Sequence, residues 1–124
     1  DTDAVLKLHG TLNGAGPMWL GRLWDKNLVD NMCKNALKNR IFSKNNYLMK
    51  FLKTIKDESR IDAVGFYDLN NICENNKIKK LQKKEIIKKK INMEGHKASD
   101  THFKSEGIRS DIPLDKLIRL LKNK

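Results

Sequence analysis

The sequence contains only two cysteines and two prolines among its 124 residues. Cys33 and Cys73 lie far apart, with no Cys-x-x-Cys pair and no histidine at metal-binding spacing. This scarcity argues against a disulfide framework and a zinc site, and it predicts a reducing, intracellular compartment. No apolar run reaches the length of a membrane span and no signal peptide is recognisable. The sequence does not distinguish between the cytoplasm, the nucleus and the mitochondrion as the location of the protein.

Glycine is absent where phosphate binding would require it. The turn Gly14-Ala15-Gly16-Pro17 lacks the third glycine of a phosphate-binding loop, and Pro17 has no N–H to donate. No helix is expected directly after it. We therefore interpret this segment as a tight turn that leads Met18, Trp19 and Leu20 into a packed strand.

Negative charge is scarce in one part of the chain. The formal net charge is +11, and residues 77–104 contain ten lysines but only three acidic residues. Clustered positive charge of this kind is typical of proteins that bind a polyanion. The alternative is that the many lysines and asparagines reflect a general compositional bias and only keep the surface solvated, without a polyanionic partner.

The first half of the chain shows a strand-like segment followed by two helical patterns. Residues 4–24 predict short strands broken by the glycine-proline turn. Asp25 is placed to cap a helix, and an Asn-rich turn separates that helix from the next. The apolar faces are Leu28, Val29, Met32, Cys33, Ala36 and Leu37 in the first helix, and Leu48, Phe51, Leu52 and Ile55 in the second. Cys33 is thus expected in the core.

The second half predicts shorter elements. A strand at 63–66 leads to Asp68, a candidate cap for a brief helix with Leu69, Ile72 and Cys73. A second helix, about 81–93, should bury Ile86, Ile87 and Ile91 and end at Gly95. Extended stretches at 96–103 and 107–112 predict a β-hairpin with its turn at 104–106. A last helix starts near Pro113 and should bury Leu114, Leu117, Ile118 and Leu121.

This order predicts an α+β, mainly helical fold. Helix, short strand, two helices and a hairpin is the order of a winged helix, here at about 45–112 and preceded by short strands. Residues 25–124 would form one domain. The sequence begins without methionine, which predicts a fragment of a longer chain, with residues 1–24 as the segment nearest the missing part. A plain α+β domain is the alternative.

Two segments carry the candidate binding residues. Lysines around the isoleucines of the 81–93 helix could neutralise phosphates, which gives affinity but no sequence information. The hairpin adds hydroxyl, imidazole and cationic groups suited to the RNA backbone and its 2′-hydroxyls. The set is Lys83, Lys84, Lys88, Lys90, Lys97, Thr101, His102, Lys104 and Arg109. Phe103 is expected in the interior rather than stacked on a base, and a general-base role for His102 is disfavoured.

Three segments resemble a known family. Residues 16–32, GPMWLGRLWDKNLVDNM, resemble the G-P-L-W-x-G-x-L-x-D segment of tRNA (guanine-26, N2) dimethyltransferases. Residues 97–117, KASDTHFKSEGIRSDIPLDKL, are similar to that family's A-S-x-T-H-F…G-I-K-T-D-A-P segment, and residues 66–69, FYDL, to its Y-Y-D-L. The three occur in the family's order, from Gly16 onward.

The resemblance implies a non-catalytic, tRNA-binding C-terminal domain. In the family, an N-terminal methyltransferase domain binds S-adenosylmethionine and presents the guanine amine through an Asp-Pro-Phe/Tyr type motif. This sequence has no Asp-Pro dipeptide, so catalytic, cofactor and metal residues are expected to be absent from it. Its partners would be tRNA, held so that the guanine between the D and anticodon stems reaches the catalytic domain, and that domain in cis.

Some residues depart from the family pattern. Asp100 stands where a basic residue is expected, Arg22 replaces a usual proline, and a Cys-rich segment of some relatives has no counterpart. Two other functions stay open at this point. One is a winged-helix DNA-binding regulator, for which only Gln82 and Asn92 could read bases. The other is a protein-docking domain that uses the tryptophan-containing segment.

Overall fold

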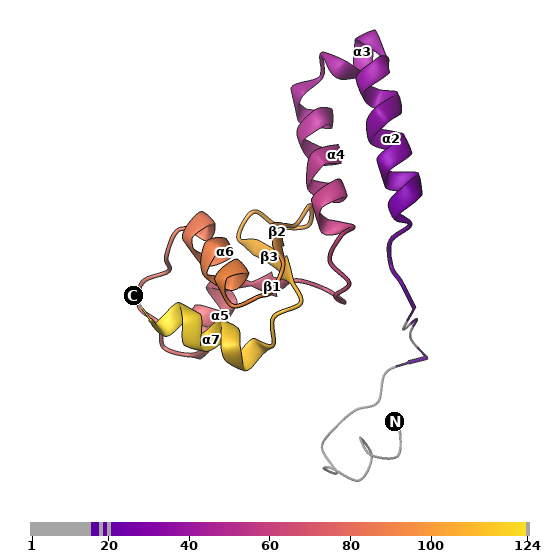
Figure 1. Cartoon of the computed structure of the whole chain (residues 1–124). Coiled ribbons are helices and arrows are strands. Elements are labelled where there is room, and N and C mark those ends of the chain that lie inside the picture. Colours follow the sequence, from indigo (N-terminus) through magenta and orange to yellow (C-terminus); the bar gives the residue numbers. More distant parts are fainter. Residues whose placement is uncertain (1–15, 18, 20, 124) are drawn as a thin grey trace.

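The computed structural model describes residues 16, 17, 19 and 21–123, and it shows an α+β protein. Helices α2 (Lys26–Lys38), α3 (Arg40–Ser43) and α4 (Asn46–Glu58) form a helical hairpin that extends from the rest of the protein (Figure 1). The rest is a compact unit. Its elements are β1 (Tyr67–Asp68), α5 (Leu69–Asn75), α6 (Lys84–Met93), β2 (Ala98–Asp100), β3 (Gly107–Ser110) and α7 (Leu114–Lys122).

Side-chain caps define the helical hairpin. Asp25 Oδ1 accepts a hydrogen bond from the Leu28 amide at 3.0 Å, as predicted, and Asn45 caps α4 in the same way. The small core between α2 and α4 contains Cys33, which confirms the prediction for this thiol. The expected apolar face of α2 is only half used, and Leu28, Met32 and Leu37 are exposed. The reason is that α2 packs against α3 and α4 but not against the sheet.

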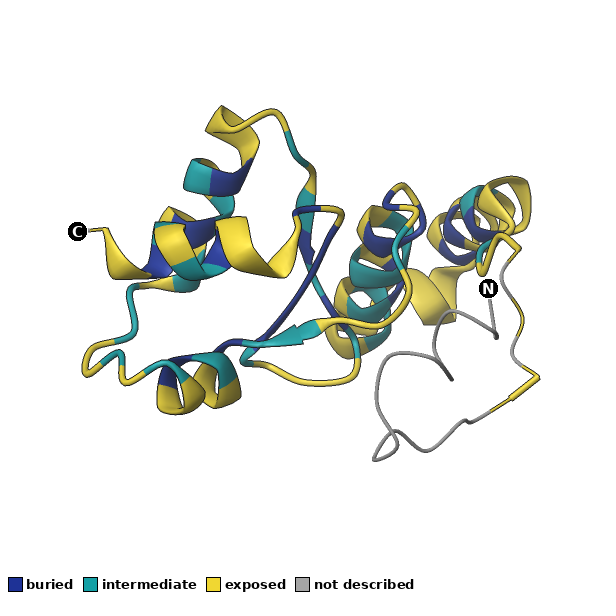
Figure 2. Ribbon diagram, turned by 90° about the horizontal axis from the view of Figure 1, so that it is seen from below, coloured by how far each residue is buried: buried dark blue, intermediate teal, exposed yellow. Residues whose placement is uncertain are grey.

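The compact unit has a three-stranded antiparallel sheet with β3 in the centre. Tyr67 pairs with Ile108 on one side of β3, and Ser99 pairs with Arg109 on the other. The predicted β-hairpin is therefore confirmed, with shorter strands and a longer loop. Helices α5, α6 and α7 turn buried residues toward the sheet (Figure 2). The main core consists of Leu69, Cys73, Ile87, Ile91, Ile108, Ile112, Leu117 and Leu121.

Helix α6 starts at Lys84, three residues later than predicted, and Ile86 is exposed rather than buried. Its end agrees with the prediction. Gly95 has φ +83°, and its amide donates to the Asn92 carbonyl while the His96 amide donates to the Ile91 carbonyl. These two bonds make a Schellman ending, in which glycine is the residue that adopts positive φ without strain.

Two further predictions need correction. Leu114 is exposed, because α7 begins at this residue, directly after Pro113, and its buried side starts at Leu117. Part of the strand segment expected at 4–24 lies outside the described residues. The described part, 16, 17, 19 and 21–24, forms no strand. Within the described residues, no helix combines the length and the apolar character that a bilayer crossing requires.

Candidate nucleic-acid interface

Glu58, the last residue of α4, connects the helical hairpin to the loop between β2 and β3. Its side chain is completely buried. Oε2 accepts a hydrogen bond from Arg109 Nε at 2.8 Å, and Oε1 accepts from the backbone N–H of His102 at 2.8 Å. The His102 ring also directs Nδ1 at Oε1, so Nδ1 carries the hydrogen, because a carboxylate only accepts. One carboxylate thus joins three parts of the fold.

Arg109 and Thr101, expected at the RNA surface, are instead interior residues. Arg109 is 3% exposed, and its guanidinium is engaged by Glu58 and by the Ala63 carbonyl at 2.8 Å. Trp24 covers it, with the guanidinium carbon 5.7 Å from the ring centroid. Thr101 is also buried. Both residues are therefore placed to position the loop, and they offer little surface to a nucleic acid.

The other residues of the β2–β3 hairpin that match the family pattern also make local contacts. Ser110 Oγ donates to the Lys97 carbonyl at 2.6 Å, and Asp111 Oδ1 accepts from the Lys97 amide at 2.8 Å. A Cβ on Gly107 would lie 2.6 Å from Thr101 Cγ2 and 2.9 Å from Phe66 Cδ2. The Thr-His-Phe…Gly-Ile-Arg-Ser-Asp pattern therefore defines the shape of a loop.

The environment of Glu58 determines its protonation. Burial acts to raise its pKa from the ordinary 4.5, but hydrogen bonds from Arg109, His102 and Thr101 outweigh burial and lower the pKa. Ionised Glu58 therefore stabilises the fold. This contribution is complete above the ordinary pKa and is lost as the pH falls through the lowered value.

Replacing the Glu58 carboxylate should make the free energy of unfolding depend less on pH in the acid range. We expect the difference in unfolding free energy between the wild type and Glu58→Gln to shrink as the pH falls from about 5 to about 3. Urea unfolding at several pH values measures it. Glu94→Gln removes the same charge from an exposed site and serves as the matched control. A constant difference across this range would show that folding does not lower the pKa of Glu58.

Two of the candidate lysines on α6 share one acidic partner. Lys84 and Lys88 each place Nζ 3.0 Å from Asp100 Oδ1, and Lys84 also donates to the Ser105 carbonyl at 2.7 Å. Burial acts to raise the pKa of Asp100, but the hydrogen bonds from the two lysines outweigh it and lower the pKa. Asp100 thus neutralises part of the charge predicted for this helix.

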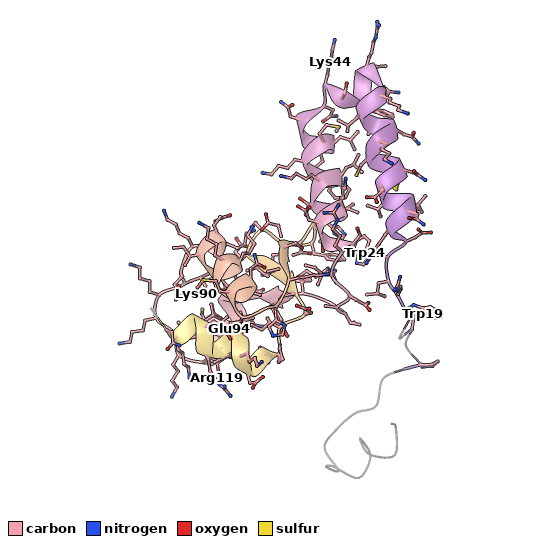
Figure 3. The ribbon with its side chains drawn as sticks, viewed as in Figure 1. Trp19, Trp24, Lys44, Lys90, Glu94 and Arg119 are labelled. Carbon is pink, nitrogen blue, oxygen red and sulfur yellow. The ribbon has the colours of Figure 1, made fainter. Side chains whose placement is uncertain are left out.

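The other candidates differ in how far they are engaged. Lys90 Nζ donates to Gln82 Oε1 at 2.8 Å and to the Asn123 carbonyl at 2.7 Å, and it lies on α6 close to α7 (Figure 3). Lys104 pairs with Asp68. Among the described residues, the ammonium groups of Lys83 and Lys97 have no ion-pair or hydrogen-bond partner, and both side chains are exposed.

The lysines of the loop between α5 and α6 belong to the charge cluster at residues 77–104 but were not among the candidate binding residues. This loop, with α6 and α7, encloses a groove of about 760 Å³. Its apolar lining is Ile78, Ile86 and Leu121, its cationic lining is Lys77, Lys79, Lys80, Lys90 and Lys122, and none of its described lining residues is acidic. Residues 77–80 lie between helices, so helical periodicity gave no signal for the groove.

Comparison with known proteins identifies the family of this chain. The model of the N2,N2-dimethylguanosine tRNA methyltransferase family matches residues 4–122. The chain belongs to this family. It is 36% identical over 112 residues to the tRNA (guanine(26)-N(2))-dimethyltransferase of Methanosphaera stadtmanae, a match that covers 90% of this chain and 28% of that enzyme. It is 39% identical over 107 residues to the Methanocaldococcus jannaschii enzyme of the same name, covering 86% and 28%.

A solved dimethyltransferase structure shows the same fold. Trm1 from Pyrococcus horikoshii, in complex with S-adenosyl-L-methionine, superposes with a TM-score of 0.74 at 31% identity. The match covers 92% of this chain and 31% of that one. The chain therefore spans less than a third of the length of these N2,N2-dimethylguanosine tRNA methyltransferases.

The described residues do not fit S-adenosylmethionine, the cofactor in that Trm1 complex. A site of the usual nucleotide-binding kind has a glycine-rich turn between a strand and a helix of a parallel sheet. Here the strands are antiparallel, and β1 continues directly into α5 through Asp68 and Leu69, with no glycine between them. We derive no chemical step from these residues.

Proposed function

We propose that this chain is the tRNA-binding C-terminal domain of an S-adenosylmethionine-dependent tRNA guanine-N2 dimethyltransferase. The parent enzyme would methylate the guanine at the junction of the D and anticodon stems. The catalytic domain in cis would bind the cofactor. The observation that carries this proposal is the family match over residues 4–122 in a chain with net charge +11.

The topology supports a winged-helix-like unit at about residues 45–112. The order α4, β1, α5, α6, β2, β3, with β3 between β1 and β2, agrees with that arrangement. In this proposal α6 and its neighbouring loop face the RNA. Residues 25–124 would form the domain, and residues 1–24 its junction with the catalytic part. The packing of α4 against α2 adds a helical hairpin to this unit.

Within this proposal the candidate residues have four roles. The exposed lysines, Lys83 and Lys97 together with those that line the groove, would attract and contact phosphates. Lys84, Lys88 and Lys104 would act from within ion pairs, in which they also fix the loop. Thr101, His102 and Arg109 would position the loop through Glu58, and Lys90 would hold the C-terminal end of α7 beside the groove.

The test is the binding of purified tRNA by the 124-residue chain at several salt concentrations. Binding should weaken steeply as salt rises, because contacts with phosphates release counterions. Lys79→Glu/Lys80→Glu should lower the affinity on the order of tenfold and reduce the salt slope by about one unit per lost contact. Salt-independent binding, or none, would contradict the proposal.

Lys34→Glu/Lys38→Glu is the matched control. It makes the same change in net charge at two exposed lysines of α2, in the helical hairpin. We expect this variant to change affinity far less than the groove variant. Equal losses in both would show that total charge, and not the groove, determines binding. Reversal of Lys84 and Lys88 should also weaken binding, but it additionally breaks the pairs with Asp100.

Of the two alternative functions, DNA reading receives little support from the described residues, whereas the docking alternative keeps one exposed tryptophan, Trp19, which is 72% exposed. Gln82, one of two residues that could read DNA bases, donates to the Asn123 carbonyl at 2.9 Å and accepts from Lys90. Trp24, whose full exposure would favour protein docking, is half-buried over Arg109 at the base of the helical hairpin (Figure 3). Competition between structured tRNA and duplex DNA separates the first alternative from our proposal.

A further inference from the structure

Five aromatic rings follow one another from α4 to β1. Tyr47 and Phe51 on α4 are nearly parallel, with ring centroids 6.3 Å apart and an interplanar angle of 12°. Phe103 and Phe66 form a second nearly parallel pair, at 5.6 Å and 12°. His102 joins the pairs, with its ring 5.8 Å from Phe51 and 4.1 Å from Phe103. We call these five residues the aromatic row.

Three rings of the aromatic row are exposed to solvent. Tyr47 is 80% exposed, Phe103 is 63% exposed and Phe66 is 37% exposed. This overturns the expectation that Phe103 packs in the interior. Large apolar side chains exposed side by side are uncommon in a protein without a partner for them, and they indicate a binding surface.

The row is rigid at its centre. Hydrogen bonds of His102 to the buried Glu58 fix the imidazole between the two ring pairs. The loop that carries Phe103 is held at both sides, by Lys84 on the Ser105 carbonyl and by Lys104 on Asp68. Rings that are already ordered lose little conformational entropy on binding, so this surface is prepared for a ligand.

The cations beside the row favour a nucleic acid. Lys50 lies one helical turn from Tyr47 on α4, and Lys104 follows Phe103 in the chain. Asp68 is the acidic residue paired with Lys104, and Glu106 and Glu74 are further carboxylates near this lysine. Exposed aromatic faces accompanied by lysines are what proteins use to stack the bases of unpaired nucleotides.

We propose that the aromatic row is a stacking surface for unpaired bases of the RNA, with Phe103 and Tyr47 as its two contact points. The proposal rests on the tRNA-binding function above and deepens it. The lysine groove would contact phosphates without regard to base pairing. The row would instead favour RNA in which bases are splayed out of the helix, and so would give the domain a preference for RNA shape.

The test measures binding of tRNA, and of a short single-stranded RNA carrying 2-aminopurine, to the 124-residue chain. Phe103→Ala should weaken binding of both RNAs on the order of tenfold, the usual effect of losing one stacked base. It should also reduce the quenching of 2-aminopurine fluorescence that stacking produces. Phe103→Tyr keeps an aromatic face and should bind like the wild type.

Phe103→Leu separates stacking from simple apolar contact, since it keeps apolar area but has no aromatic face. It should resemble Phe103→Ala. Wild-type RNA affinity in Phe103→Leu would show that apolar contact is enough without an aromatic face, and it would overturn the stacking proposal. Phe42→Ala, at an exposed phenylalanine of α3 outside the row, is the matched control. If the wild type binds no RNA, the proposed function fails, whereas RNA binding unaffected by Phe103→Ala overturns the stacking inference alone.

Discussion

Glu58→Ala is expected to lower the free energy of unfolding by about 3–5 kcal/mol, the usual cost of leaving a buried ionic partner alone. The substitution leaves the Arg109 guanidinium buried with only the Ala63 carbonyl as its hydrogen-bond acceptor among the described residues. It also removes the acceptor of the His102 amide. Urea unfolding of the 124-residue chain, followed by circular dichroism, measures the loss.

A double variant distinguishes an uncompensated charge from lost packing. Glu58→Leu/Arg109→Met replaces both partners by apolar side chains, and buried pairs replaced in this way are often no less stable. We therefore expect the double variant to be more stable than Glu58→Ala, although His102 still lacks its acceptor. If the double variant were less stable than Glu58→Ala, an uncompensated buried charge would not be the main source of the effect.

Gly107→Ala should destabilise the protein by about 1–3 kcal/mol, the usual range for an overpacked interior site. The added methyl group would meet Thr101 Cγ2 at 2.6 Å, Phe66 Cδ2 at 2.9 Å and the Lys104 carbonyl at 3.2 Å. The backbone carbonyl cannot move without reshaping the loop. Thermal unfolding gives the size of the effect.

Thr101→Ser tests whether crowding is the cause. This change removes the methyl group nearest to the new side chain and keeps the hydroxyl that hydrogen-bonds to Glu58. Adding Thr101→Ser to Gly107→Ala should recover part of the lost stability, because the closest contact disappears. If the recovery were absent, the effect would come from the backbone and not from this contact.

Local signals in the sequence predicted local structure well. Asp25 and Asp68 cap their helices because a short carboxylate accepts from the first-turn amides, and this requires only neighbouring residues. Gly95 ends α6 for an equally local reason. The start of α6 was wrong because Leu81 has the apolar spacing of a helix and yet packs against the core from a non-helical segment.

The candidate site depended on contacts that no local pattern reveals. Glu58 and Arg109 are 51 residues apart, and each alone looks like an ordinary surface charge. Their burial follows from the way α4 packs against β2, the strand that pairs with the Arg109 segment of β3. Likewise, the lysines of α6 were predicted by composition, but only the fold brings Asp100 between two of them. Ion pairs between residues far apart in the sequence therefore determine which lysines remain available to bind a phosphate.

The carboxylate of Asp100 has a consequence for selectivity. An incoming phosphate that uses Lys84 or Lys88 must compete with a carboxylate already 3.0 Å from each ammonium. A single small anion gains one such contact and loses to the internal partner. A long polyanion, already held by the exposed lysines of the groove, meets the same competition with most of its binding free energy secured. If this surface binds RNA as proposed, Asp100 would therefore favour a long polyanion over a single small phosphate.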